Sequence, residues 1–106
     1  MMNKFNNSIF TTRAVKEELP EEVLLFIVGL VKNMYIEVKE VDYLQVITIE
    51  NNTLIHTQEI PEYKKSYTLL TTINSCKLFF IDSGEYSTLM FSQEKKKNIE
   101  NIYFRK

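Results

Sequence analysis

Apolar residues gather into one dense block in the first half of the chain and alternate with polar residues in much of the second half. The block runs from Val23 to Val31. Pro20 and two glutamates stand just before it, which is typical of a helix start, because proline tolerates the first helical position and early carboxylates complement the positive end of the helix dipole. The pattern predicts a helix from Pro20 to about Asn33 or Tyr35.

The apolar side chains of this helix would cover more than one of its faces. A helix that packs on a sheet needs an apolar stripe about 100° wide, and this block exceeds such a stripe. Either loops and terminal segments cover the surplus, or part of it contacts another subunit or a partner protein. The apolar positions are Val23, Leu24, Leu25, Phe26, Ile27, Val28, Leu30 and Val31.

A β-hairpin is predicted around Asn51 and Asn52, with strands from Tyr43 to Glu50 and from Thr53 to Ile60. Asparagine tolerates the left-handed backbone that a two-residue turn demands. The turn fixes a register in which residues on one face pair across the strands. The expected pairs are Ile49 with Leu54, Ile47 with His56, Gln45 with Gln58, Thr48 with Ile55, and Val46 with Thr57.

A second hairpin is predicted around Ser83 and Gly84, because glycine supplies the permissive backbone that a tight turn needs. Its strands run from Cys76 to Ile81 and from Tyr86 to Phe91. In the expected register Phe80 faces Ser87 and Leu78 faces Leu89.

Two further segments are β-prone, Ser8 to Val15 at the start of the chain and Ser66 to Thr72 after Pro61. Together with the two hairpins they make five or six strands. The predicted fold class is α+β, with an antiparallel sheet built from hairpins and packed against one main apolar helix. Beyond Lys95, either a short charged C-terminal helix or a tail is expected.

Size and composition predict a single domain over residues 1–106. The 106 residues are 44% hydrophobic and 25% charged, as is usual for a globular domain that buries its own core. Only 2 glycines and 2 prolines occur, and no stretch resembles a flexible linker.

Charge and cysteine content limit the expected location and partners. The formal net charge of -1 gives no general attraction to phosphate backbones, so nucleic acid is not the expected partner. Cys76, the single cysteine, cannot form an internal disulfide, and a free thiol suits the reducing cytoplasm. Residues 1–10 lack the apolar core of a signal peptide. The longest apolar run is also shorter than the roughly 20 residues of a membrane span, so a cytoplasmic protein without membrane insertion is expected.

No motif for catalysis, cofactor binding or metal binding is recognisable. The chain has no glycine-rich phosphate loop, paired-cysteine zinc pattern, GxSxG elbow or HExxH helix. His56 is the only histidine, and its strand position is explained by packing or by the surface. Asp82 and Glu85 flank a turn, where acids are usually solvated. We therefore expect a non-enzyme with no catalytic residues, cofactor or metal.

The candidate binding residues lie in the segment HTQEIPEYKK, from His56 to Lys65. His56 and Gln58 share a strand face with Gln45, because strand side chains alternate with period two. One interpretation makes these three residues a polar recognition strip on the protein surface, continued by Tyr63, Lys64 and Lys65. The alternative is an ordinary solvated sheet face and turn.

Several segments together resemble a small family from Gram-positive bacteria, the domain of unknown function 960. The resemblance is carried by TTRAV from Thr11, LPEEV from Leu19, DYLQV from Asp42, HTQEIPEYKKSY from His56 and FFIDSGEYSTLMFSQE from Phe79. It implies a compact α+β domain found in bacterial genomes and their mobile elements, with no established activity.

The leading functional hypothesis is a non-enzymatic protein-binding module. A phage- or plasmid-borne regulator or inhibitor of a host protein, of the anti-defence or anti-CRISPR kind, would fit the small size and the surplus apolar helix. The alternatives are a housekeeping homodimer with a structural role, a nucleic-acid-binding protein that uses the basic and aromatic C-terminal residues, and an unrecognised small enzyme.

Overall fold

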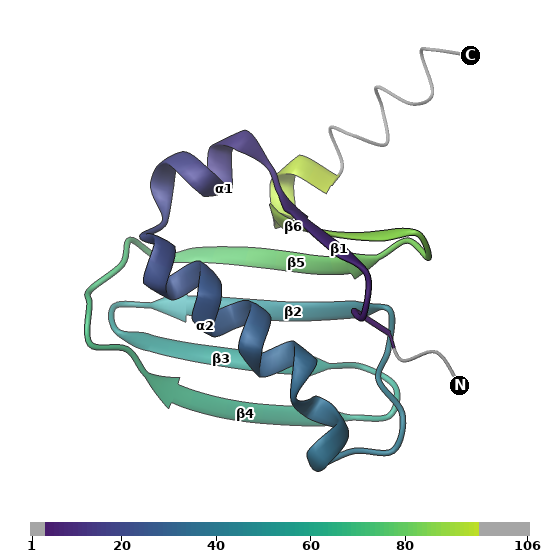
Figure 1. Cartoon of the computed structure of the whole chain (residues 1–106). Coiled ribbons are helices and arrows are strands. Elements are labelled where there is room, and N and C mark those ends of the chain that lie inside the picture. Colours follow the sequence, from purple (N-terminus) through teal and green to yellow (C-terminus); the bar gives the residue numbers. More distant parts are fainter. Residues whose placement is uncertain (1–3, 96–106) are drawn as a thin grey trace.

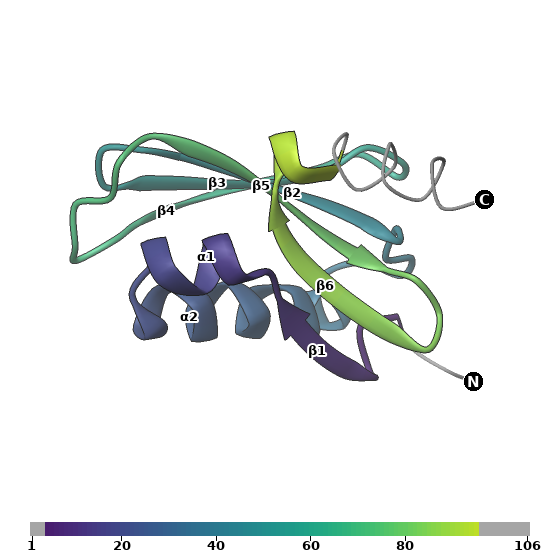
Figure 2. The same cartoon turned by 90° about the horizontal axis from the view of Figure 1, so that it is seen from above.

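The computed structural model describes residues 4–95 as a six-stranded sheet with two helices on one side of it (Figures 1 and 2). Along the sheet the strand order is β1-β6-β5-β2-β3-β4. The elements are β1 (Ser8–Thr11), α1 (Arg13–Glu18), α2 (Glu21–Lys32), the 3-10 helix η1 (Met34–Ile36), β2 (Leu44–Glu50), β3 (Thr53–Gln58), β4 (Tyr63–Thr68), β5 (Cys76–Asp82) and β6 (Tyr86–Phe91). Residues 92–95 add a helical turn, and the rest of the expected C-terminal helix or tail lies outside the described residues. The α+β fold class is confirmed.

The main helix lies where the sequence predicts it. Pro20 is its N-cap, and Asn33 is its C-cap. Helix α2 crosses the sheet in front of β2, β3 and β4 (Figure 1). Val23, Ile27 and Val31, each four residues after the last, form its buried stripe, because residues with this spacing share one helix face.

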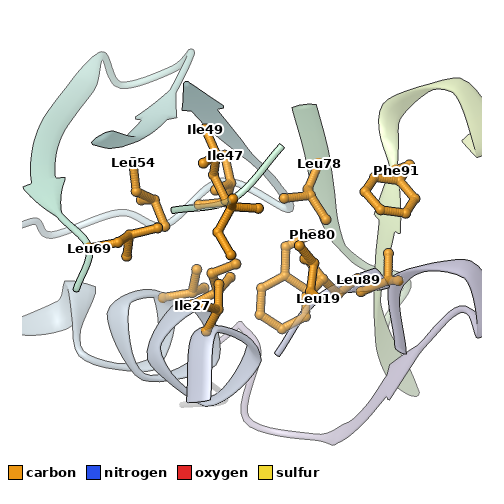
Figure 3. Close-up of a cluster of buried hydrophobic side chains, with 14 of the residues drawn as sticks. Leu19, Ile27, Ile47, Ile49, Leu54, Leu69, Leu78, Phe80, Leu89 and Phe91 are labelled. Atoms are coloured by element: carbon orange, nitrogen blue, oxygen red, sulfur yellow. The ribbon is translucent and has the colours of Figure 1, made fainter. Parts of the chain in front are cut away.

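The buried stripe of α2 packs against the strand positions that face it. Figure 3 shows Ile27 beside the apolar side chains of the central strands. The largest core contributions from the sheet are fully buried. These residues are Ile47, Ile49, Leu54, Leu78, Phe80 and Leu89. One face of the sheet and one face of α2 therefore make the hydrophobic core.

The first hairpin has the predicted register, from the pair Val46–Thr57 to the pair Ile49–Leu54. Asn51 adopts a positive φ of 59°, as a two-residue turn requires. Gln45 and Gln58 are joined by a hydrogen bond between their side chains, 2.8 Å long.

The predicted register of the second hairpin is wrong by two residues. Phe80 pairs with Leu89 rather than with Ser87, and Leu78 pairs with Phe91 rather than with Leu89. The reason lies in the turn: Gly84, with a φ of 105°, takes the first central position instead of the second, as in type II′ turns. A shift of two residues keeps every side chain on its predicted face.

The predicted boundaries of the two outer strands are also corrected. Strand β1 ends at Thr11, because the Thr12 side chain accepts a hydrogen bond from the Val15 N–H and starts a helix. This strand lies parallel to β6, so the sheet is mixed rather than wholly antiparallel. Strand β4 begins at Tyr63 and not at Ser66, because residues 59–62 form a turn that returns the chain at once.

Within residues 4–95, the helices are all too short or too polar to cross a membrane.

Candidate functional site

The three residues of the predicted polar strip lie together, but they are inside the protein. Gln45 and His56 are fully buried, and Gln58 is 2% exposed. Their shared face is the one that the helices cover, so neither a solvent-exposed recognition strip nor a solvated sheet face is correct. Alternation along a strand identifies which side chains share a face, but it does not identify the face that a helix covers.

Gln58 is the centre of this buried polar network. Its Oε1 accepts hydrogen bonds from the Asp42 N–H at 2.6 Å and from Gln45 Nε2 at 2.8 Å. Its Nε2 donates to the carbonyl oxygens of Glu40 at 3.2 Å and of Pro61 at 2.7 Å. The side chain thus uses its full hydrogen-bonding capacity and ties β3 to the segment before β2 and to the turn after β3.

His56 is held as a neutral imidazole. Gln45 donates its amide hydrogens to Gln58 and to the Asp42 carbonyl oxygen, so Gln45 Oε1 is the acceptor for His56 Nε2, 2.7 Å away. The other ring nitrogen, Nδ1, has no hydrogen-bond partner within the described part of the chain. Burial lowers the pKa of His56 to about 4, and the Glu37 carboxylate opposes this shift.

The remaining three candidate residues lie on β4, an outer strand of the sheet. The half-buried Tyr63 ring stands edge-on to His56, with 5.2 Å between the ring centroids, and burial raises the pKa of Tyr63 to about 12. The exposed Lys65 forms an ion pair with Glu37, 2.6 Å between Nζ and Oε2, which raises the pKa of Lys65. Lys64 points from the opposite face, because neighbouring strand residues alternate. The structure thus separates the six predicted residues into three groups. The buried group is Gln45, His56 and Gln58, the pair on the helix side of β4 is Tyr63 and Lys65, and Lys64 lies alone on the other face.

A second surface is centred on Phe26 of α2, the apolar helix for which contact with another subunit or a partner was one of the two alternatives from the sequence. Phe26 is 38% exposed and Leu25 is 66% exposed. The Phe26 ring contacts Tyr67 of β4 edge-on, with centroids 5.4 Å apart. This contact divides the space between α2 and β4 into two hollows. The surplus of apolar residues in the helix pointed to this side of α2 but did not identify which residues stay exposed.

The two hollows differ in their linings. The first, of about 300 Å³, is the more apolar and is lined by Glu22, Val23, Phe26, Thr68, Leu69, Leu70 and Thr71. The second, of about 320 Å³, is lined by Leu25, Phe26, Gly29, Leu30, Asn33, Met34, Glu37, Tyr63 and Tyr67. We call the two hollows together the Phe26 surface.

A third hollow, of about 310 Å³, lies beside the half-buried Cys76. Burial raises the pKa of the Cys76 thiol, and the nearby Glu18 carboxylate adds to that shift. A raised pKa makes the reactive thiolate form scarcer. Among the described residues, no three His, Cys, Asp or Glu side chains gather in a way that could hold a metal ion.

Comparison with known families identifies the chain. The family model described as "Staphylococcal protein of unknown function (DUF960)" matches residues 8–94. The chain belongs to this family. The match covers every strand and helix from β1 to β6, and it confirms the resemblance in the sequence to the domain of unknown function 960.

Comparison with solved structures supports the fold. A crystal structure described as a "protein of unknown function from Enterococcus faecalis" is similar, with a TM-score of 0.76 and 20% sequence identity over 89% of this chain and 97% of that chain. No curated protein matches. These similarities establish the architecture and carry no activity, so the Phe26 surface has to be interpreted from its own chemistry.

Proposed function

We propose that this protein is a non-enzymatic protein-binding module and that the Phe26 surface is its contact site. The observation that carries the proposal is the exposure of Leu25 and Phe26 on a helix whose buried stripe, Val23, Ile27 and Val31, already fills the core. Bulky apolar side chains that lie beside hollows and within a polar rim are typical of protein interaction sites.

The expected partner presents an amphipathic segment with bulky apolar side chains. Its apolar side chains would enter the hollows on either side of Phe26. Glu22 borders the first hollow and Glu37 the second, so basic residues that flank the apolar ones would complement the rim. Gly29 lies between these positions with open space above its Cα atom, which allows the partner backbone to come close.

Tyr63 remains part of the proposed site, but in a different role. It lines the second hollow together with Tyr67, so it is a half-buried aromatic wall rather than the end of a polar strip. Lys64 lies on the other side of the sheet and belongs to no part of this surface. Gln45, His56 and Gln58 act from the interior, where they hold the strands that support Tyr63.

We further propose that binding regulates or inhibits the partner by covering a surface that the partner needs. A phage- or plasmid-borne origin would fit such a role, and the free thiol of Cys76 suits a cytoplasmic protein. The alternative is a homodimer that buries the same surface against a second copy. The two possibilities differ in the mass of the purified protein, which sedimentation equilibrium measures.

The test is affinity capture from the native host with the wild-type protein and a Leu25→Ser/Phe26→Ser variant. A specific partner should be retained by the wild type and lost by the variant. Ile60→Ser is the matched control, because Ile60 is 73% exposed in the turn after β3 and lines neither hollow of the Phe26 surface. Equal retention by both variants would contradict the proposal, and a wild-type dimer that Leu25→Ser/Phe26→Ser converts to monomer would favour the homodimer.

A further inference from the structure

The sheet has a second face, which α1 and α2 do not cover (Figure 2). The strand register identifies its residues, because paired residues share a face and neighbours along a strand alternate. We call it the open face. Across its centre lie Met90, Phe79, Val46, Thr57 and Lys64, one from each of the strands β6, β5, β2, β3 and β4.

The charge on the open face is mainly basic, although the whole chain has a formal net charge of -1. Lys64 of β4 and Lys77 of β5 project from it, and the helical turn of residues 92–95 brings Lys95 to it. Glu50, at the end of β2, is the one acid among the described strand positions of this face. Glu94 lies in the same helical turn as Lys95, but its Oε2 accepts hydrogen bonds from the Thr12 hydroxyl and the Phe91 N–H, both at 2.9 Å. A polyanion therefore meets a locally basic surface that the total charge conceals.

Aromatic rings lie among these charges. The ammonium groups of Lys77 and Lys95 stand 5.9 Å and 5.7 Å from the centroid of the Phe79 ring. At the β1 side of the same face, Phe10 and Tyr86 form an edge-on pair with centroids 5.7 Å apart, and they are 55% and 46% exposed. The open face thus has a half-buried ring, Phe79, beside two lysines and an exposed aromatic pair at its β1 side. Aromatic rings and cationic side chains on one surface are the combination that binds single-stranded nucleic acids by base stacking and phosphate pairing.

We propose that the open face binds a single-stranded nucleic acid. The strand runs across the sheet from the Phe10–Tyr86 pair past Phe79 to Lys64. Strands lie about 4.8 Å apart, so roughly 14 Å separates β5 from β4 and leaves room for several nucleotides. A base that stacks on Phe79 displaces the two ammonium groups from the ring, and both then lie beside the flanking phosphates.

The chemistry favours a nucleic acid over an acidic peptide. A carboxylate-rich peptide would pair with the three lysines, but its acidic side chains would not stack on the rings of Phe79, Phe10 and Tyr86. Recognition of this kind tolerates different sequences, because every base presents a π-face. The inference is independent of the Phe26 surface, which lies on the other side of the sheet.

The test uses the full chain and a fluorescently labelled oligothymidylate or oligouridylate, with binding followed by fluorescence anisotropy at increasing salt. Contacts from three lysines predict a slope of about −2 for log K against log salt, and each lysine removed should reduce that slope by about 0.7. Phe79→Leu keeps an apolar side chain but removes the stacking surface, and it should weaken binding about tenfold.

Controls keep the result interpretable. Lys32→Gln makes the same charge change as Lys77→Gln but on the exposed end of α2, so it should leave affinity and salt slope unchanged. Circular dichroism and thermal melts verify that each variant is folded. No saturable binding at low salt, equal loss in Lys32→Gln and Lys77→Gln, or full competition by polyglutamate would each overturn the proposal, the last by indicating an acidic protein partner.

Discussion

At the scale of single residues, the buried His56 makes stability depend on pH. The pKa of His56 is about 4 in the folded protein against 6.5 for an ordinary histidine, so the unfolded chain takes up the proton first as the pH falls. The contribution is fully present above about pH 6.5 and is lost between there and about pH 4. At 1.36 kcal/mol per pKa unit, the loss amounts to about 3 kcal/mol.

Urea unfolding at a series of pH values measures this loss. His56→Gln keeps a polar side chain that can donate to Gln45 but removes the titrating group. Its free energy of unfolding should therefore change less than that of the wild type as the pH falls from about 7 to about 5. Parallel curves for the two proteins over this range would show that His56 does not cause the pH dependence.

Gln58→Glu should destabilise the protein although it changes one group at nearly constant shape. The substitution replaces the amide nitrogen, which donates to the carbonyl oxygens of Glu40 and Pro61, with a carboxylate oxygen that cannot donate. A buried charge without a partner lowers the free energy of unfolding by about 3 kcal/mol or more at neutral pH. Chemical denaturation should show that the deficit shrinks at acidic pH, where the introduced carboxyl group is protonated and can donate again.

Glu59→Gln is the control for Gln58→Glu, because the neighbouring Glu59 is exposed and its substitution should change stability by no more than about 0.5 kcal/mol. A deficit in Gln58→Glu that stays the same at all pH values would contradict the proposed donor role of the amide.

The grouping of Gln45, His56 and Gln58 could be predicted from the sequence, and their burial could not. The asparagine turn and the period of two determine which side chains are neighbours. Burial depends on where α2 and η1 pack, which is a tertiary property. A hydrophobicity pattern also assigns three polar residues to the surface, because polar side chains are rarely buried unless they form hydrogen bonds with one another or with the backbone.

At the scale of secondary-structure elements, helix α2 has a core face and an outer face that should respond differently to the same kind of change. Ile27→Ala removes a fully buried side chain and should lower the free energy of unfolding by about 2 to 5 kcal/mol. Leu25→Ala removes a side chain that is 66% exposed, and the free energy of unfolding should change by no more than about 0.5 kcal/mol. Thermal and urea unfolding of the two variants measures the difference, and equal losses would mean that Leu25 is buried against something else.

The two hairpins show which parts of an element the sequence determines. Both hairpins exist as predicted, and both have their side chains on the predicted faces. The first register is correct because Asn51 and Asn52 allow few alternatives. The second is wrong because Gly84 fits either central position of a two-residue turn, and only the full set of strand contacts decides between them.

At the scale of the whole molecule, the parallel pairing of β1 with β6 could not be predicted from the sequence pattern. Its partner strands lie at opposite ends of the chain, and no turn joins them. The predicted first strand is also too long, because Ala14 and Val15 are β-prone or neutral when read alone. The cap by Thr12 and the burial of Val15 against the core favour a helix instead.

The N-terminal segment is attached to strand β5 by buried and hydrogen-bonded contacts. Phe5 is fully buried, and its ring lies 4.7 Å from that of Phe80. Its backbone N–H donates to Asp82 Oδ2 at 2.7 Å, and Asn7 Nδ2 donates to Asp82 Oδ1 at 3.1 Å. Burial acts to raise the pKa of Asp82, but the hydrogen bonds from Phe5, Gly84 and Asn7 outweigh it and lower the pKa.

This segment lies before residue 8, where the family match begins, yet it completes the core. Phe5→Ala should therefore lower the free energy of unfolding by about 3 to 5 kcal/mol, because it opens a cavity beside Phe80 that the sheet cannot close. Phe10→Ala is the matched control, since Phe10 is 55% exposed and should cost less than about 1 kcal/mol. Urea unfolding measures both. Equal small losses would show that the N-terminal segment contacts the domain without stabilising it. A large loss in Phe5→Ala alone would show that a residue outside the family match stabilises the fold through its packing on β5.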